Sequence, residues 1–528
     1  MAARTLQHRL SRRLWRRGLP HEAYLAAGAL LQYSGSSFKY FLEVDHIDGI
    51  EAIRRNHALL SDAAERAGVE VFAVSAVGED APVLGVPSSQ VASLIAGLRD
   101  IASELPFVVA LRGTDGHDVS GLAYTLLQED VGEVTRVLVY LNFRERATDR
   151  RLRAEYGCIV EVWEEDEEGR LRAPSLNGRT ATVGPRDRER RASIDLHGTE
   201  VPTFDIFARP GLLDVPFPID VVYLWVDGSD PAWKERKAAR LRQLGREPEQ
   251  DALKNARFEE GDELRYSLRS LHRYAPWIRK IYLVTDRQHP AWLRECPGRL
   301  EIVDHTDILP PDCLPTFNSH AITGAVHHIE GLSERFLVMN DDILLGRPVT
   351  PDQFFFSNGA TKFFVSKAAL PAPDDSEREG ALMAARARSA ELVSAVTGTR
   401  PNCGFKHTPI AFDREFLYEL ENEFSSWRET LASPFRSGDN IVPEWIHHYI
   451  GYHRGRCFPS KMSYAYFDIG SPEAMKRLRS RIRKGRPSVL CVNDVTEGTV
   501  GGLSRHAALD RALAKMLPWQ SPYESDQG

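Results

Sequence analysis

The sequence lacks the long apolar segments of a membrane protein. No run of apolar residues approaches the roughly 18 that span a bilayer, and residues 1–20 lack the apolar core of a signal peptide. Cysteine is scarce as well: the 6 cysteines include no CxxC pair and no spacing typical of a metal site. We therefore expect free thiols in a reducing compartment, and a cytoplasmic protein.

A surplus of positive charge is also missing. The formal net charge of -7 argues against a general nucleic-acid-binding protein, because such proteins neutralise phosphates with a basic surplus. The 42% hydrophobic and 27% charged fractions are typical of a soluble globular protein. A chain of 528 residues is too long for a single hydrophobic core and should form more than one domain. We predict a basic tail or amphipathic helix at 1–30, an α/β domain of unknown role at 31–205, and a further domain at 206–528.

The N-terminal segment 1–20 is rich in arginine and contains no acidic residue. Its leucines recur at roughly helical spacing, and a basic amphipathic helix can lie on the anionic face of a membrane. A basic tail that stays in solvent has the same composition. The sequence therefore leaves peripheral contact with the inner face of the cell membrane open.

Residues 31–205 alternate between strand-like and helix-like patterns. We expect strands at 41–47, 69–77, 106–113, 135–145 and 158–166, and helices at 50–68 and 88–105. No nucleotide-binding or catalytic signature occurs among them. The polar segment 177–201 is dense in charge and turn residues, which indicates a linker or a hairpin.

Two aspartates interrupt an apolar strand in FLVMNDDILLG, residues 336–346. Buried carboxylates such as Asp341 and Asp342 are costly unless they are paired or bind a cation. Phosphate-handling enzymes use Mg²⁺ or Mn²⁺ for this purpose, since these cations prefer carboxylate oxygens and bridge phosphates. The alternative is that both aspartates only open a turn or cap a helix.

A second candidate site lies in FPIDVVYLWVDGSDPAW, residues 217–233. Its β-branched and aromatic residues predict a strand that ends at the turn pair Asp227-Gly228. Ligands of doubly wound sheets bind beyond the carboxyl ends of the strands. We place Asp220, Tyr223 and Trp225 on one side of this strand as a nucleoside site, with a plain strand and turn as the alternative.

Arginines and a serine precede the next predicted strands. Arg265 and Arg269 lie one turn apart on an amphipathic helix, before the strand IRKIYLVTD, and arginines near a strand mouth can clamp a diphosphate. Such arginines can instead be solvated or pair with acids. Ser319 precedes a helix that begins near Ala321, where it is either an N-cap or part of a phosphate site.

These segments together resemble the Stealth family. The resemblance rests on IDVVYLWVDGSDPAW, ELRYSLRSLHRYAPWIRKIYLVTD, LPTFNSHAI with GLSERFLVMNDDILLGR, and KHTPIAFDREFLYELE with FRSGDN. The family comprises bacterial capsular polysaccharide phosphotransferases and the catalytic subunit of the lysosomal N-acetylglucosamine-1-phosphotransferase. The similarity runs from about residue 206 to the C-terminus, so 206–528 is predicted to be the catalytic domain, including a C-terminal helical segment. The first 200 residues lie outside it.

The resemblance implies a Rossmann-like α/β core of the nucleotide-sugar transferase type. It implies transfer of a hexose 1-phosphate from a UDP-sugar to a hydroxyl of a polysaccharide or lipid-linked glycan acceptor, with release of UMP and dependence on a divalent cation. By motif position, Asp220 and the turn Trp225–Gly228 would serve the nucleotide. The oligomeric state stays open.

The residues that the resemblance brings to the active site are Ser319, Asp342, His407 and Arg436. Asp341 and Asp342 would hold the metal, and Arg436 would offer a planar fork to phosphoryl oxygens. His407 would be a general base or a transition-state donor, or else a covalent nucleophile.

Two further positions qualify the resemblance. Asp439 follows Arg436 closely, and would orient that arginine or join the metal shell. Vertebrate relatives carry a glutamate where this chain has Thr323, so specificity for N-acetylglucosamine does not carry over. The competing functions are a metal-dependent glycosyltransferase that releases UDP, and a non-catalytic nucleotide- or glycan-binding protein.

Overall fold

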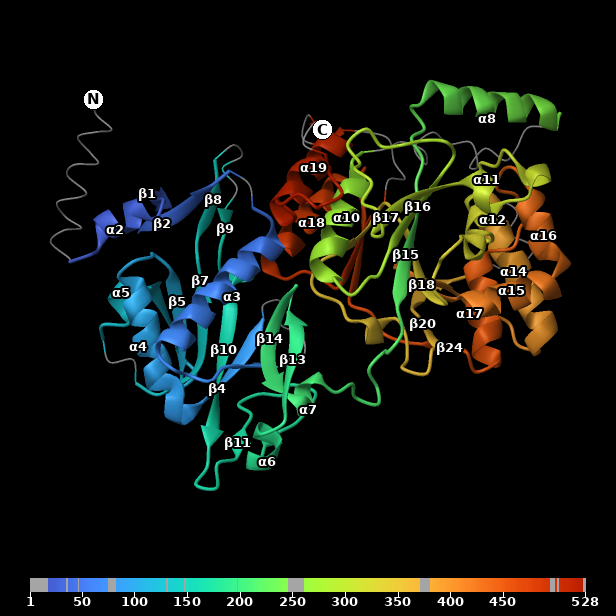
Figure 1. The fold of residues 1–528 in the computed structure, drawn as a ribbon. Helices are drawn as coiled ribbons and strands as arrows, with labels where there is room; N and C mark the ends of the chain where they lie inside the picture. The colour runs from blue at the N-terminus through green and yellow to red at the C-terminus, as the bar shows by residue number, and fades with distance from the viewer. Residues whose placement is uncertain are drawn as a thin grey trace, which may run out of the picture. The chain divides into compact units, whose positions relative to one another are not determined.

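The computed structural model forms two compact units, Met1–Gly211 and Leu212–Gly528 (Figure 1). It describes residues 18–34, 37–45, 47–74, 82–129, 132–146, 149, 151–196, 198–245, 261–370, 380–493, 499–500 and 503–525. Most of the predicted basic helix, residues 1–17, lies outside the described residues. The predicted boundary between 205 and 206 falls inside the first unit, in the short helix α7 (Asp205–Ala208).

The first unit is built around a mixed sheet with the strand order β12-β11-β10-β7-β5-β6, in which β4 pairs with β10 in parallel and with β3. A smaller sheet has the order β1-β2-β8-β9. The strands are β1 (Ala29–Ser34), β2 (Ser37–Val44), β3 (Phe72–Val74), β4 (Val83–Pro87), β5 (Val108–Gly113), β6 (Asp118–Leu122), β7 (Val134–Tyr140), β8 (Phe143–Glu145), β9 (Arg151–Leu152), β10 (Cys158–Glu165), β11 (Leu171–Arg172) and β12 (Thr182–Val183).

The helices of this unit follow the predicted apolar periodicity. The two long ones, α3 (Gly49–Arg66) and α4 (Val91–Ala102), pack together so closely that a Cβ at Gly97 would lie 2.2 Å from the carbonyl oxygen of Ala63. Only glycine fits at this crossing. Besides α7, the short helices are α2 (His21–Ala26), α5 (Ala123–Leu126) and α6 (Pro185–Arg188).

The polar segment at 177–201 contains the start of a hairpin. Strands β13 (Arg191–Leu196) and β14 (Thr199–Phe204) pair antiparallel from residue 191 to residue 204, so the hairpin alternative is confirmed. Phe204 packs with Phe72 and Trp163 in the core of the first unit. The hairpin is therefore tied to the main sheet of that unit through its last strand.

The second unit has a five-stranded sheet with the order β17-β16-β15-β18-β23. Four of the strands are parallel and the last is antiparallel. Their bounds are β15 (Ile219–Leu224), β16 (Ile281–Thr285), β17 (Leu300–Asp304), β18 (Arg335–Asn340) and β23 (Ile410–Asp413). The parallel strands thus run third, second, first, fourth in chain order, which matches one half of a Rossmann sheet and the first strand of the other half. The predicted Rossmann-like α/β core is confirmed.

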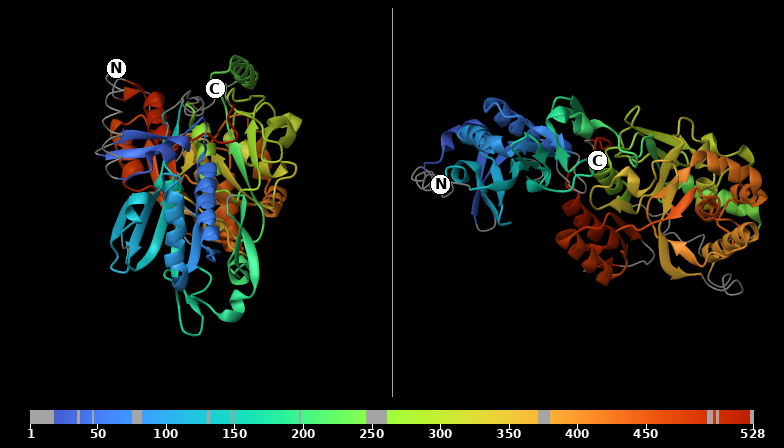
Figure 2. Two further views of the ribbon diagram at one scale, coloured as in Figure 1. Left: turned by 60° about the vertical axis from the view of Figure 1, so that its left-hand side comes forward. Right: turned by 90° about the horizontal axis from the view of Figure 1, so that it is seen from below.

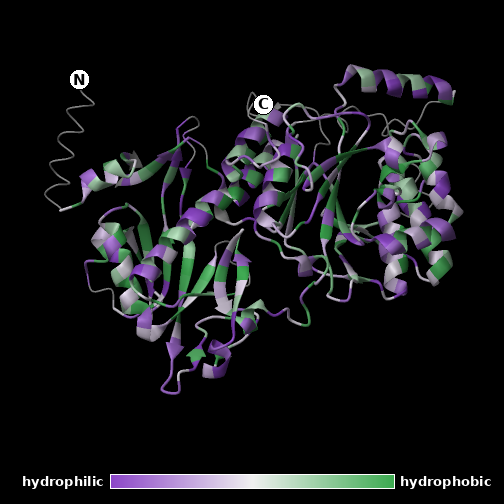
Figure 3. Ribbon diagram, viewed as in Figure 1, coloured by the Kyte–Doolittle hydropathy of each residue, from purple (hydrophilic) through white to green (hydrophobic). Residues whose placement is uncertain are grey.

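Helices cover both faces of this sheet (Figures 1 and 2). On one face, α15 (Arg414–Glu423), α16 (Ser425–Ala432) and α17 (Pro443–His453) share an apolar core with side chains such as Val222, Val338 and Phe412. On the other face, Ser267 of α10 (Glu263–Tyr274) meets Tyr223 of β15. Figure 3 shows the strands between these layers as largely hydrophobic.

Beyond the end of β18, the chain enters a smaller three-stranded sheet. Its order is β19-β26-β25, from β19 (Ile343–Leu345), β25 (Tyr464–Asp468) and β26 (Val489–Asn493). Helix α10 fixes β19, because Ser267 Oγ donates to the Ile343 carbonyl at 2.5 Å and the Leu345 N–H donates to Ser270 Oγ at 2.9 Å. The two aspartates that precede β19 are thereby held at the rim of the main sheet.

The remaining elements of the second unit are α8 (Pro231–Leu244), α11 (His305–Ile308), α12 (Ser319–Thr323), α14 (Ala381–Thr397), α18 (Pro472–Lys484), α19 (Arg505–Met516), β20 (Thr361–Phe363), β21 (Val365–Ala369), β22 (Cys403–Phe405), β24 (Cys457–Pro459), β27 (Thr499–Val500) and β28 (Leu503–Ser504). Within the described parts of the chain, every helix is too short or too polar to cross a membrane.

Candidate active site

Asp341 and Asp342 lie in the turn between β18 and β19, at the carboxyl end of a central parallel strand. Asp342 Oδ2 lies 3.4 Å from His407 Nδ1, 3.3 Å from Cys491 Sγ and 3.1 Å from Asn493 Nδ2. Its second oxygen, Oδ1, is buried and has no hydrogen-bond partner among the described residues. Oδ2 therefore contacts all three neighbouring side chains, whereas Oδ1 is placed to bind a ligand.

His407 lies between two polar side chains just before β23. Its Nδ1 lies 3.1 Å from Cys491 Sγ and 3.4 Å from Asp342 Oδ2, and its Nε2 lies 3.0 Å from Nδ2 of Asn340, the last residue of β18. If the Asn340 amide donates to Nε2, these contacts assign the proton of the neutral ring to Nδ1. The side chain is 36% exposed, so a substrate can reach the ring.

The two charges of this pair stabilise each other. Burial lowers the pKa of His407, but the charge of Asp342 and the hydrogen bond to it raise this pKa above its ordinary value overall. Burial raises the pKa of Asp342, whereas the charge of His407 and the hydrogen bonds from His407, Cys491 and Asn493 bring it below the ordinary value. The Asp342 carboxylate therefore stabilises the protonated form of His407.

Arg436 and Ser319 form a second pair. Ser319 Oγ accepts hydrogen bonds from Arg436 Nε at 3.0 Å and Nη2 at 2.5 Å. Ser319 is the first residue of α12, whereas the N-cap is Asn318, whose side chain accepts from the His320 N–H. The N-cap alternative for Ser319 is therefore wrong, because Asn318 takes that position and leaves the serine hydroxyl to the arginine.

The charges of His407 and Arg436, one from each pair, both act on Glu444, which the sequence-based reasoning missed. Burial raises its pKa above the ordinary value, while the charges of Arg386, Arg436 and His407 oppose that rise. Arg386 comes from α14, and its buried Nε has no partner among the described residues. Glu444 follows Pro443 in the first turn of α17, where an acidic residue is ordinary in any helix. No local signal marks it as part of a site.

The predicted nucleotide residue Asp220 lies at the other end of its strand. Its carboxylate is fully buried, accepts from Arg279 Nε at 2.8 Å, and accepts from the Ser333 N–H at 2.8 Å. Side chains alternate along a strand, so Asp220 faces away from the side shared by Tyr223 and Trp225. The predicted grouping of these three residues is wrong, because Asp220 belongs to an ion pair at the amino end of β15.

The other nucleotide candidates are divided between the core and the rim. The Tyr223 hydroxyl is buried 2.7 Å from Ser267 Oγ, which makes it a packing residue. Trp225, just past β15, is buried and its Nε1 has no partner among the described residues. Asp227 Oδ1 accepts from the Ser229 N–H at 2.7 Å. Asp227 and Gly228 follow the carboxyl end of β15, as predicted.

The two candidate clamp arginines do not act together. Arg269 is buried and forms a bidentate ion pair with Glu524, at 2.8 Å from Nε and 2.6 Å from Nη2, and its Nη1 donates to the Leu517 carbonyl at 3.1 Å. Its predicted diphosphate role is contradicted, since the guanidinium is used to hold the C-terminal segment. The Arg265 guanidinium lies 4.9 Å from the Trp292 ring centroid.

Replacing Arg269 with methionine tests this structural assignment. We expect the free energy of unfolding to fall by about 3–5 kcal/mol, because the substitution leaves a buried carboxylate without its partner. The KM for the donor should stay unchanged in the folded variant. Urea denaturation measures the first quantity. Arg428→Met, which removes an exposed pair with Asp312, is the matched control and should cost less than about 1 kcal/mol. A raised KM for the donor in the Arg269 variant would support the original prediction that Arg269 binds the donor diphosphate.

The structure does not group Asp439 with the predicted metal-binding aspartates. Asp439 is exposed and its Oδ2 lies 3.3 Å from Ser437 Oγ, whereas the possible ligands grouped with Asp342 are His407 and Cys491. Burial and the charge of Asp342 raise the pKa of Cys491 well above its ordinary value, so its thiol stays protonated. The oxygens that suit Mg²⁺ or Mn²⁺ are therefore the orphaned Asp342 Oδ1 and the adjacent Asp341 carboxylate.

The strand order defines an α/β fold of the Rossmann type, and Asp342 and His407 lie beyond the carboxyl end of β18, where such sheets bind their ligands. Three family models match the chain: Stealth protein CR1, conserved region 1, at residues 217–245; CR2, conserved region 2, at 257–363; and CR3, conserved region 3, at 406–452. With the relatives described next, these matches show that the chain belongs to the Stealth family.

The curated relatives are named exopolysaccharide phosphotransferases. One from Streptomyces coelicolor is 37% identical over 485 residues, which is 89% of this chain and 82% of that protein. Another from the same organism is 35% identical over 495 residues, 91% of this chain, and the chain spans about half of its length (52%). CpsY of Mycobacterium tuberculosis is 35% identical over 374 residues, 70% of this chain and 69% of that protein.

These matches correct one expectation. A match over 91% of the chain extends into the first unit, where the sequence showed no family motif. Among solved structures, the galactosyltransferase LgtC in complex with donor and acceptor sugar analogues covers 57% of this chain and 97% of its own, at 10% identity and a TM-score of 0.30. The assignment of the fold rests on the strand order described above.

Proposed function

We propose that this chain transfers a hexose 1-phosphate from a UDP-sugar to a hydroxyl of a polysaccharide or lipid-linked glycan acceptor. UMP is released, and the product is a phosphodiester-linked capsular or cell-surface polysaccharide. The observation that carries the proposal is the Asp342–His407 pair beyond the carboxyl end of β18, and the Ser319–Arg436 pair supports it, because the charges of both His407 and Arg436 act on Glu444. The names of the relatives support phosphate transfer in exopolysaccharide synthesis.

His407 supplies the proton acceptor in this reaction. The acceptor hydroxyl attacks the β-phosphorus, a new O–P bond forms, and the bond from that phosphorus to the bridging oxygen breaks, so that UMP leaves with the bridging oxygen. The hydroxyl proton passes to His407 Nε2, the nitrogen that faces Asn340 in the substrate-free enzyme. Asp342, whose Oδ2 lies 3.4 Å from Nδ1, stabilises the imidazolium that results.

Arg436 neutralises the charge of the transferred phosphoryl group. Its contacts from Nε and Nη2 to Ser319 Oγ fix the plane of the guanidinium before substrate arrives. A guanidinium held in one plane in this way stabilises developing charge on phosphoryl oxygens better than a mobile cation does. Asp341 and Asp342 Oδ1 would hold a divalent cation, which when bound would neutralise the charge of the donor diphosphate.

The reaction is tested by following the β-phosphate. A UDP-sugar that carries ³²P at the β-phosphorus is supplied with a glycan acceptor, and the products are separated. We expect the label in the acceptor and unlabelled UMP in solution, and a screen of donors by UMP release then identifies the sugar.

The competing functions give different products in the same assay. Label retained in released UDP would identify a glycosyltransferase, because that reaction breaks the bond at the anomeric carbon. Nucleotide binding without turnover of any donor would identify a non-catalytic binding protein. Either result would overturn the proposal.

A further inference from the structure

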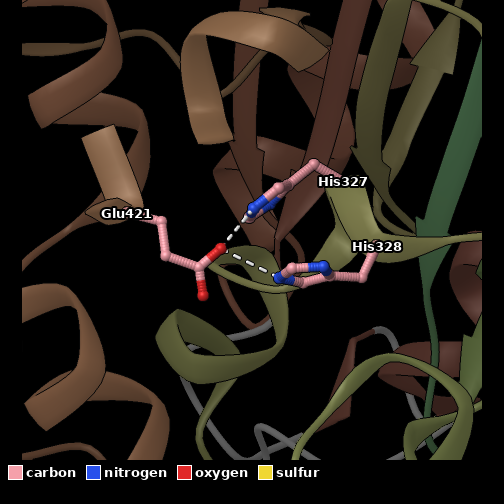
Figure 4. A group of neighbouring side chains, drawn as sticks. All are labelled: His327, His328 and Glu421. Carbon is pink, nitrogen blue, oxygen red and sulfur yellow. Dashed lines mark hydrogen bonds and ion pairs between the residues drawn. The ribbon is translucent and has the colours of Figure 1, made fainter. Parts of the chain in front are cut away.

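Two consecutive histidines and a glutamate converge on one another (Figure 4), and this group shares no residue with the group of Asp342, His407 and Cys491. His327 and His328 belong to the short helical turn η5 (Val326–His328), and Glu421 comes from α15. Both rings direct Nε2 at the same oxygen, with His327 Nε2 2.7 Å and His328 Nε2 2.9 Å from Glu421 Oε2. Three potential ligand atoms therefore meet at one point.

The backbone that carries the histidines is held firmly by α15. The His327 carbonyl accepts hydrogen bonds from Arg414 Nε at 2.8 Å and from the Tyr418 hydroxyl at 3.0 Å. The Tyr418 ring also packs against both imidazoles, with centroids 4.6 Å from that of His327 and 5.2 Å from that of His328. Ligands held in this way are preorganised, so they lose little freedom when an ion binds.

A metal at this point requires both Nε2 atoms unprotonated and the carboxylate ionised, so a bound ion would displace the protons that the rings share with Glu421 Oε2. The alternative is a cluster in which both rings donate Nε2–H to the carboxylate and no ion binds.

We infer that His327, His328 and Glu421 form a binding site for Zn²⁺, separate from the Asp342 cluster. Two imidazoles and a carboxylate are ligands that zinc accepts, whereas Mg²⁺ prefers oxygen alone. Tetrahedral zinc with bonds of about 2.0–2.2 Å separates its ligand atoms by roughly 3.3–3.5 Å. The group must therefore open by about half an ångström. His328 and Glu421 are 33% and 22% exposed, which gives the ion a route from solvent and leaves its fourth position to water.

The position of the site in the chain indicates a structural role. Turn η5 joins α12, which begins at Ser319, to the segment that enters β18, while α15 directly follows β23 and the loop that holds His407. An ion bound between η5 and α15 would fasten together two segments that carry Ser319 and His407. The site touches no reacting group, so it stabilises the transferase and performs no chemistry.

Calorimetry on the full chain tests this assignment. The protein is stripped with a chelator and titrated with ZnCl₂ in saturating Mg²⁺, and melting is followed at each zinc concentration. We expect Glu421→Gln and His328→Gln to bind one zinc ion fewer than the wild type, or to bind that ion more than about 100-fold more weakly, since losing even an outer-shell partner costs roughly 10- to 100-fold. Zinc should raise the Tm of the wild type, and it should not raise that of either variant.

Two controls locate the ion. His453→Gln removes an exposed imidazole from α17 and should bind zinc as the wild type does. Cys491→Ser alters the other group of possible ligands and should also retain the site. With Co²⁺ in place of zinc, visible absorption without a thiolate charge-transfer band is expected. The proposal is overturned if the wild type binds no zinc, or if zinc binding survives in both site variants.

Discussion

Asp342→Asn lowers kcat by roughly 10⁴-fold, the size of effect seen when the carboxylate that orients a catalytic histidine becomes an amide. The variant loses the charge that favours the His407 imidazolium, and an amide nitrogen facing Nδ1 would reverse the tautomer of the ring. It also weakens the proposed cation ligand at Oδ1. Steady-state UMP release with the donor found in the labelling assay measures the loss.

The matched control for this prediction is Asp439→Asn. Asp439 is exposed and lies near Ser437, so the same change of chemical group should leave kcat within about twofold of the wild type. The far-UV circular dichroism and the Tm of both variants check that the fold survives. Near wild-type turnover by Asp342→Asn would remove Asp342 from the reaction. A large loss in Asp439→Asn would place Asp439 in the site.

The sheet of the second unit was largely predictable, because its strands are continuous apolar runs. Parallel strands are buried on both faces and therefore read as unbroken β-branched and aliphatic segments. The predicted strand IRKIYLVTD contains β16 (Ile281–Thr285), which is buried throughout, and the interrupted run at 336–346 forms β18 and β19 with Asp341 and Asp342 between them. The order of the strands required pairing information that no local pattern contains.

The failed site predictions share one physical cause. An arginine near a strand end looks the same in the sequence whether it faces a diphosphate or a carboxylate. Arg269 pairs with Glu524 across 255 positions of the chain, and Asp220 pairs with Arg279 across 59. Only the tertiary structure shows that each arginine donates its hydrogen bonds to the carboxylate of its partner and not to a ligand. Local pattern therefore identified polar residues in the sheet but not their partners.

The missed residues illustrate the opposite error. Glu444 resembles any acidic residue in the first turn of a helix, and the histidines at 327 and 328 resemble a polar turn after α12. Each acquires a role only from residues distant in the sequence: the charges of Arg386, Arg436 and His407 act on Glu444, and Glu421 lies beside the histidines. The family motifs, in contrast, identified Ser319 and Arg436, which the structure does bring together.

Arg436→Lys tests whether this contact matters for its geometry or only for its charge. We expect kcat to fall by about 10²- to 10³-fold, the cost of removing one preorganised donor from a charged transition state. Lysine keeps the positive charge, but it has no planar fork to bond Ser319 Oγ from two nitrogens. The KM for the donor should change much less than kcat, because the fork acts on charge that develops during the transfer.

Arg388→Lys is the matched control for this substitution. Arg388 lies on α14, and its side chain is 42% exposed and pairs with Glu429 at 3.2 Å, so exchanging it for lysine should leave both kcat and KM near the wild-type values. Ser319→Ala should lower kcat less than Arg436→Lys does, since it frees the guanidinium plane without removing the fork. Wild-type kcat in Arg436→Lys would show that charge alone suffices, and would remove the planar contact with Ser319 from the mechanism.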